Sequence, residues 1–393
     1  MPARRLIVLL CLIVAANTVS IGAFPALLPE LGASAKLADW QLGAVAGAFG
    51  LARMLTDVPV GLFITHHLAR ALWLGPLALL AGALLVVVGG SFATLLLGRA
   101  LMGAGHTLAT LAGLTAILRH RAGPGLASSL AAQEFSAMLG VLAGAGLAAA
   151  LPGSVSWNLA LLAACAPVLL TLALVPLLLR VLPRPAGGAR PLFARSTETS
   201  RVESVAPSGG SDAVRPWLGL LAGAAGAAVA ISYATVDQFV IPVRGSREFA
   251  LDRAGIARLL MLGQVVDILA LLPLGALADR RGAQPVLGGV LLVFALAVGL
   301  VVFGTLPLMA AGCVLFGLAM AGWTLPLGIL RAVTPPAQVA WRTALYRVAV
   351  DGGMCMGPVL AGLLATRHAG VLPTILIVVL AATGGALLAR HRA

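Results

Sequence analysis

The sequence predicts an all-α membrane protein with twelve transmembrane helices in two six-helix halves related by pseudo-twofold symmetry. Three observations predict it: the composition, the recurrence of long apolar segments, and the placement of basic residues between them. Of the 393 residues, 60% are hydrophobic and only 10% are charged. A soluble domain carries about 25% charged residues, and no soluble core could cover this much apolar surface. The lipid bilayer is therefore the expected surroundings of most of the chain.

Apolar segments long enough to cross a bilayer follow one another along the whole chain. A hydrocarbon core about 30 Å thick needs about 20 residues of helix. Backbone groups in lipid must pair within their own segment, so each span is expected to be helical. The first six spans lie at residues 6–28, 40–62, 71–89, 92–118, 126–150 and 157–180, and the second six lie at residues 217–242, 256–278, 284–304, 307–331, 343–365 and 370–389.

Basic residues indicate the orientation of these spans. With the N-terminus in the cytoplasm, most arginines fall in cytoplasmic segments, and the outer side holds only Lys36, Arg244, Arg247, Arg253 and Arg367. This bias is what the positive-inside rule predicts. We therefore expect a bacterial inner-membrane protein with both termini in the cytoplasm. The net charge of +13 does not indicate nucleic-acid binding, because the basic residues form no stripe on a soluble face.

The apolar pattern stops between residues 181 and 216, where Pro, Gly, Ser, Thr and charged residues take over. Such a composition cannot bury a core, so it predicts a cytoplasmic linker. The chain is thus expected to consist of an N-terminal six-helix bundle (1–180), a linker (181–216) and a C-terminal six-helix bundle (217–393).

An internal repeat supports this division. A shift of 214 residues places Pro273 and Gly275 on Pro59 and Gly61, and it places Gly317 on Gly103. One offset that aligns two pairs of spans indicates duplicated halves. Coincidence is the alternative, because 47 glycines make isolated matches common.

The segment after the eighth span reads GALADRRG and contains Gly275, Asp279, Arg280, Arg281 and Gly282. It resembles the signature that the major facilitator superfamily carries between the second and third helices of each half. We expect Gly275 to allow close helix packing, Asp279 to accept hydrogen bonds, and the arginines to anchor the turn in the cytoplasm. The first-half equivalent has Thr65 where the family has Asp.

The fourth span contains the segment from Arg99 to His106, which resembles the fourth-helix motif of that family, whose arginine is tied to proton coupling in antiporters. An arginine in hydrocarbon costs several kcal/mol unless it is paired. The alternative is that Arg99 extends to the nearby outer end of its span. The resemblance implies the twelve-helix drug:proton antiporter branch, although the fifth span, with Gly140 and Gly144, lacks the Gly-Pro pair of that branch.

Two Arg/Asp pairs occur inside spans at i, i+4 spacing: Arg53 with Asp57, and Arg347 with Asp351. Each pair can bridge along one face of its helix. In the family the second and eleventh helices meet between the halves, so the four residues resemble an interdomain gate that breaks when the cytoplasmic side opens. The alternative is that each pair only neutralises itself.

Glu134 and Asp267 are the candidate proton-coupling carboxylates, together with Arg99. Ionisable groups inside spans are functional candidates, and Glu134 has no obvious partner in its own helix. Asp267 lies near the expected midplane. Pairing with another helix is the structural alternative for both. Asp237, near the outer end of its span, is expected to be interfacial.

Asn17, His106 and Tyr233 are candidates for lining the central cavity, where helices one, four, seven and ten converge in this family. A lone polar residue in a membrane helix more commonly makes an interhelical hydrogen bond. His66 and His67 lack further ligands, so no metal site is expected, and no cofactor is expected.

The resemblance implies a secondary active transporter that moves a small solute by alternating access, and proton-coupled efflux of a hydrophobic or weakly polar compound is our first hypothesis. A metabolite or sugar exporter or uptake facilitator of the same fold is the alternative.

A multi-span enzyme is disfavoured by the lack of an H-x-x-x-D, D-x-D or H-E-x-x-H motif, and a non-transporting sensor is a further class. The expected partners are a small-molecule substrate, protons and lipid, with no nucleic acid, and the protein is expected to be a monomer.

Overall fold

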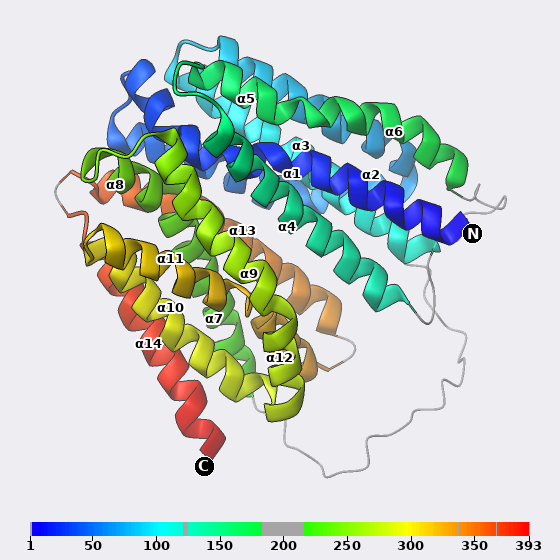
Figure 1. The fold of residues 1–393 in the computed structure, drawn as a ribbon. Coiled ribbons are helices and arrows are strands. Elements are labelled where there is room, and N and C mark those ends of the chain that lie inside the picture. The colour runs from blue at the N-terminus through cyan, green and yellow to red at the C-terminus, as the bar shows by residue number, and fades with distance from the viewer. Residues whose placement is uncertain (1, 121–124, 183–215, 336–337, 367, 393) are drawn as a thin grey trace, which may run out of the picture.

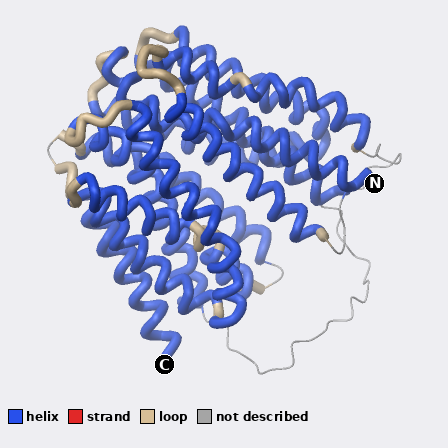
Figure 2. Tube along the Cα trace, in the orientation of Figure 1, coloured by secondary structure: helices blue, strands red, loops and turns tan. Residues whose placement is uncertain are grey.

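The computed structural model describes residues 2–120, 125–182, 216–335, 338–366 and 368–392. Within these ranges every regular element is a helix (Figure 1), and short loops join most of the helices (Figure 2). The expected linker, apart from its first two residues and its last, lies outside the described residues.

Six helices form the N-terminal half and the rest form the C-terminal half. The first set is α1 (Pro2–Ser34), α2 (Asp39–Val88), α3 (Phe92–His120), α4 (Leu126–Ala150), α5 (Trp157–Cys165) and α6 (Pro167–Val181). The second set is α7 (Pro216–Thr235), the π-helix η1 (Val236–Val240), α8 (Ile241–Arg247), α9 (Arg253–Arg281), α10 (Ala283–Phe303), α11 (Leu306–Met320), α12 (Leu325–Ala332), α13 (Val339–Leu364) and α14 (Val371–Arg392).

The described residues contain 11 helices that are long and apolar enough to cross a membrane, one fewer than expected. The difference lies in α2, whose 50 residues include both the second and the third expected span. A straight helix of that length would extend about 75 Å, more than twice the hydrocarbon thickness. His67 interrupts it with non-helical backbone angles (φ −128°, ψ 40°). The chain bends at His67 and is helical on both sides of it. No Gly or Pro lies at this point, so the sequence gives no sign of the bend.

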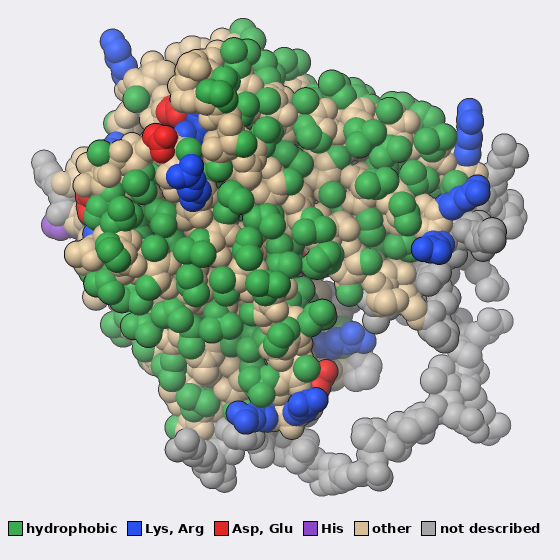
Figure 3. All heavy atoms as spheres, viewed as in Figure 1, with side chains coloured by type: hydrophobic (Ala, Val, Ile, Leu, Met, Phe, Trp, Pro, Cys, Tyr) green, Lys and Arg blue, Asp and Glu red, His purple; other side chains and the backbone are tan. Residues whose placement is uncertain are grey.

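The two halves meet at one end of the molecule and diverge toward the other (Figure 1). We call the end that carries both chain termini the terminal end, and the opposite end, which carries the α1–α2 and α8–α9 connections, the distal end. Hydrophobic side chains cover most of the visible face, and the surface is hollowed between the halves at the terminal end (Figure 3).

Backbone-to-backbone contact between α2 and α13 joins the halves toward the distal end. A Cβ at Gly43 would overlap the carbonyl oxygen of Pro358, and one at Gly47 would overlap that of Cys355. Glycines of this kind let membrane helices pack at short range. We call this contact the α2–α13 seam.

The 214-residue offset also relates two contacts in the structure. A Cβ at Gly103 in α3 would overlap the carbonyl oxygen of Phe49 in α2. The residues 214 positions later repeat this contact, because a Cβ at Gly317 in α11 would overlap the carbonyl oxygen of Gly263 in α9. The same helix pair is therefore packed the same way in each half.

The expectation that Gly275 allows close helix packing is wrong. Gly275 is exposed, and a Cβ built there would meet no atom within 4 Å; the same holds for Gly61 at the equivalent position of the first half. The sequence motif marks these positions, but the close approach between helices occurs at Gly103 and Gly317 instead.

These contacts predict opposite effects of Gly→Ala substitution. Gly103→Ala and Gly317→Ala should lower the melting temperature of the purified protein, because overpacking costs about 1–3 kcal/mol. Gly61→Ala and Gly275→Ala are matched controls inside helices and should leave it unchanged or raise it, since Ala gains up to about 1 kcal/mol in a helix. A loss of stability in the controls equal to that in the packed pair would contradict the assignment.

Candidate functional site

Ion pairs join the two halves along the α2–α13 seam. Arg53 Nη2 lies 2.9 Å from Asp351 Oδ1, and Arg347 Nε lies 3.3 Å from Asp57 Oδ2. The expectation that each pair bridges within its own helix is wrong, because the partners are exchanged between α2 and α13. In each helix the i, i+4 spacing places the Arg and the Asp on one face. That face lies against the other half. Asp351 is 2% exposed, although its Oδ1 receives no aligned hydrogen bond.

Two further ion pairs connect the halves at the distal end. Arg253, the first residue of α9, is buried and donates from Nε to Glu30 of α1 at 2.8 Å, and its Nη2 also donates to the carbonyl of Val155 at 2.7 Å. Arg247 at the end of α8 donates to Asp39 at the start of α2 at 2.6 Å. The sequence placed these arginines among outer-side residues but gave no sign of their partners, which lie more than 200 positions away in the chain.

Arg99 lies inside the N-terminal half with 1% of its surface exposed. Its guanidinium carbon is 3.5 Å from the centre of the Phe24 ring and 4.9 Å from that of Phe49. Among the described residues no carboxylate forms a salt bridge with it, and Nε and Nη1 have no hydrogen-bond partner. Arg99 is thus held between aromatic faces and does not extend to a membrane surface.

Asn17 and His106 are buried in the same half. The Thr171 hydroxyl of α6 donates to Asn17 Oδ1 at 3.1 Å, so Asn17 links two helices. His106 Nε2 lies 3.3 Å from the Thr110 hydroxyl, and its ring is 5.5 Å from that of Phe49. Both make local contacts within their bundle.

A small pocket with a cavity volume of about 20 Å³ lies in the C-terminal half among α7, η1, α8, α9 and α11. Tyr233, Asp237, Gln264, Asp267 and Phe316 contribute to its lining. Asp267 is 6% exposed, and its Oδ1 has no hydrogen-bond partner among the described residues. Asp237, which the sequence suggested was interfacial, lies here in the π-helical segment η1.

The side chain of Glu134, on α4 of the N-terminal half, is exposed. Helix α4 packs against α9 of the C-terminal half. Asp267 lies on α9, so the two expected coupling carboxylates are carried by helices that pack against each other. The packing of α4 on α9 is one of the contacts between the two halves. Arg99 lies apart from both, enclosed by α1, α2 and α3.

The expected loop motif lies at the end of α9. Asp279, Arg280 and Arg281 are exposed, and within the described ranges Asp279 makes no hydrogen bond or salt bridge. Gly282 ends the helix with φ of +87°, a conformation that favours glycine. In the first half, Thr65 stands at the position equivalent to Asp279. Arg119 of α3 donates there to the backbone carbonyl of Thr65 at 2.8 Å.

His66 and His67 are exposed, and their rings are 6.4 Å apart. The described part of the chain holds no group of three or more His, Cys, Asp or Glu residues that could bind a metal.

Comparison with known proteins identifies the fold. A sequence model described as Major Facilitator Superfamily matches residues 6–255. No curated protein sequence matches the chain. A mutant of the nucleoside transporter NupG has a TM-score of 0.71 at 16% identity over 98% of each chain.

Two other solved structures are similarly close. A bacterial homologue of the human lysosomal transporter Spinster, inward-facing and unoccupied, has a TM-score of 0.70 at 16% identity, over 99% of this chain and 94% of the other. A mutant of the peptide transporter POT has a TM-score of 0.69 at 14% identity, over 98% of this chain and 92% of the other. At such identities the likeness concerns the fold.

A double-mutant cycle tests the exchanged ion pairs. Arg53→Gln and Asp351→Asn should each lower the melting temperature, and the double variant should lose less than the sum, with a coupling of about 0.5–3 kcal/mol. The matched cycle of Arg53→Gln with Asp57→Asn should show the smaller coupling, because those two residues belong to the same helix and different pairs. Stronger coupling within α2 than between α2 and α13 would contradict the geometry.

Proposed function

The chain belongs to the Major Facilitator Superfamily, and we propose that it is a secondary active transporter that exports a hydrophobic or weakly polar compound in exchange for protons. One observation carries the proposal: ionisable groups inside the spans gather where the halves face each other. Such groups are costly in hydrocarbon and mark ion or substrate paths. Two bundles that rock about this boundary would expose it to one side at a time.

The proposed topology has twelve crossings, with α2 crossing twice on either side of His67. The terminal end is cytoplasmic, and residues 181–216 link bundles 1–180 and 217–393 on that side. The excess of arginine in the segments assigned to the cytoplasm supports this orientation in a bacterial inner membrane. The protein acts as a monomer in this proposal.

The proposed gate consists of Arg53, Asp57, Arg347 and Asp351 in the seam. These pairs are formed although the halves diverge at the terminal end, which argues against a gate that breaks when that side opens. We therefore place their separation, together with that of the Arg253–Glu30 pair, at the opening of the distal end.

The proposed coupling groups are Glu134, Asp267 and Arg99. Two carboxylates on helices that pack together repel each other when both are ionised. Protonation would relax their repulsion across the boundary, which links the proton to the relative position of the halves. Arg99 would contribute from inside the N-terminal bundle.

Transport of a polar metabolite in either direction is the second candidate, because the similar structures include a nucleoside and a peptide transporter. Those likenesses also favour transport over an enzyme or a sensor.

Gradient-driven flux tests the coupling proposal. In proteoliposomes with an imposed pH gradient, the parent should move N-phenyl-1-naphthylamine, a neutral hydrophobic dye, whereas Glu134→Gln, Asp267→Asn and Arg99→Ala should each reduce the flux about tenfold or more. Dye exchange without a gradient should persist in at least the two carboxylate variants. Undiminished gradient-driven flux in all three would overturn the assignment.

Cysteine labelling tests the topology. In a variant without the four native cysteines, an impermeant maleimide added to intact cells should label Gly153→Cys and Glu248→Cys at the distal end. It should label His66→Cys and Asp279→Cys only after permeabilisation. Labelling of His66→Cys from outside would remove the second crossing from α2 and with it the twelve-span scheme.

A further inference from the structure

The pocket that Asp237 and Asp267 line has room for one small ion. We propose that it binds a single Na⁺, held by the two carboxylates together with uncharged oxygens beside them. This inference rests on the proposed transport function, because it names an inorganic ion that would take part at one of the proposed coupling groups.

The size of the pocket limits what it can hold. Its cavity volume is about 20 Å³. A cavity needs about 10–15 Å³ of probe-occupied volume to hold one water molecule, so this one has room for a single particle of about that size. An alkali-metal ion without its hydration shell fits such a space. Mg²⁺ gives up its waters reluctantly and is therefore a poor occupant.

The negative charge of the pocket is not compensated by the residues that the structure describes. Asp237 and Asp267 both line it, and no described lining residue is Lys, Arg or His. Asp237 accepts a hydrogen bond from Gln238 at 2.7 Å. Asp267 is 6% exposed, and its Oδ1 has no hydrogen-bond partner in the described part of the chain. A buried carboxylate without a partner is costly, and a bound cation would supply the missing charge.

Four side chains with oxygen atoms line the pocket. Besides the two carboxylates, Tyr233 contributes a phenol and Gln264 an amide. Gln264 lies three residues before Asp267, so both project from one face of α9. Carboxylate and carbonyl oxygens suit hard cations. One oxygen from each side chain would give four ligands, short of the six to eight that Ca²⁺ takes.

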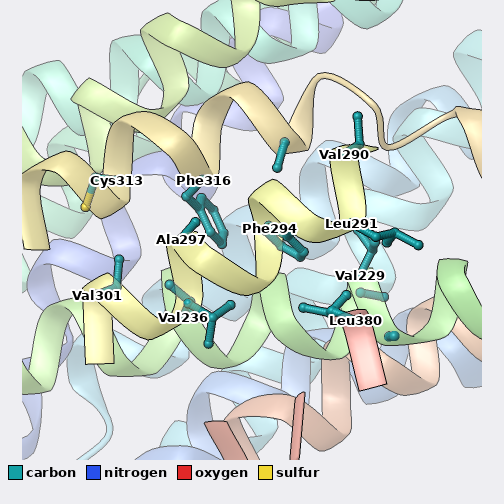
Figure 4. Packing of buried hydrophobic residues seen from close by; sticks show 14 of the residues in the cluster. Val229, Val236, Val290, Leu291, Phe294, Ala297, Val301, Cys313, Phe316 and Leu380 are labelled. Carbon is teal, nitrogen blue, oxygen red and sulfur yellow. The ribbon is translucent and has the colours of Figure 1, made fainter. Parts of the chain in front are cut away.

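Packing holds one of these oxygen-bearing side chains in place. The Tyr233 ring stacks on that of Phe316, with centroids 6.1 Å apart. Phe316 in turn lies against Phe294 of α10, whose ring centre is 5.1 Å away (Figure 4). Selection between ions of different size depends on cavity size and on how rigidly the ligands are held. A fixed ring therefore favours discrimination between Na⁺ and the larger K⁺.

The π-helical turn carries one of the carboxylates. Residues Val236–Val240 form η1, and Asp237 lies in its first turn. Single π-turns inside helices occur frequently at functional sites. Here the turn accompanies the placement of a second carboxylate on the pocket that Asp267 lines.

The N-terminal half contains a cationic side chain at the equivalent place. There the guanidinium of Arg99 lies over Phe24 and Phe49. The position 214 residues after Arg99 is Cys313, and the position equivalent to Phe49 is Gly263. Both of these small residues line the pocket. The first half thus fills this place with its own cation and a phenyl ring, whereas the second half leaves space beside two carboxylates.

Binding without any gradient tests the proposal. Purified full-length protein would be dialysed to equilibrium against radioactive Na⁺ at one fixed alkaline pH, with choline as the replacing cation. We expect saturable binding of a single Na⁺ per chain. Unlabelled K⁺ should compete at least about tenfold less well than unlabelled Na⁺, and Ca²⁺ should compete no better than K⁺.

Variants locate the site. Asp267→Asn and Asp237→Asn should each weaken Na⁺ binding about tenfold or more, because each removes a charge with little change of shape. Gln264→Lys should abolish binding, since the ammonium of the lysine would supply the missing charge. Glu248→Gln removes a carboxylate from the distal surface and is the matched control, with Na⁺ binding unchanged.

Variants are compared only when they elute from a sizing column as the parent does. Ion competition on the parent protein decides the question if a variant does not fold. No saturable Na⁺ binding, K⁺ competing as well as Na⁺, or unchanged binding in either Asp variant would overturn the proposal.

The Na⁺ site and the proposed function fail separately. Na⁺ binding to a protein that shows no gradient-driven flux would overturn coupled transport alone. Flux driven by a pH gradient in a protein that binds no Na⁺ would overturn the Na⁺ site alone.

Discussion

The cost of placing an ion in hydrocarbon governs the arrangement of this protein. An ionised side chain in a span must find an opposite charge, a polarisable ring or water. The folded chain shows the first two of these: Arg53 and Asp351 pair across the seam, Arg253 pairs with Glu30 at the distal end, and Arg99 lies on two phenyl rings. Most of these solutions join the two bundles, so the interactions that make the ions tolerable also hold one conformation together. The carboxylate of Asp267, which has no partner, is the exception that draws attention to the pocket.

Close helix packing provides the frame on which these charges are placed. Lipid offers no hydrophobic drive for helices to associate, so short-range contact between small residues matters more than in water. Gly43 and Gly47 bring α2 against α13, and Gly103 and Gly317 do the same for a helix pair within each half. The contact at Gly43 and Gly47 holds α2 close to α13. The face of α2 that carries Arg53 and Asp57 therefore lies directly opposite the face of α13 that carries its own Arg/Asp pair.

Composition and spacing were sufficient for the fold, since a bilayer constrains helix length and polarity strongly and locally. They failed where the outcome depended on tertiary contact. The i, i+4 spacing of Arg53 and Asp57 predicted a shared face correctly but not the partner, because a helix face does not reveal what lies opposite. The Arg253–Glu30 pair spans 223 positions and had no local signal. The place of Asp237 on the pocket could not be predicted, because the π-helical turn that carries it has no marker in the sequence. The extent of α2 past His67 was missed for a similar reason, because the bend there has no Gly or Pro.

The pocket is lined by residues of one bundle only. In a rocking mechanism it would move as a rigid body with that bundle, so its shape would stay constant while its access changes. Its lining would change only through substitutions in that bundle, whereas the seam draws its residues from both bundles.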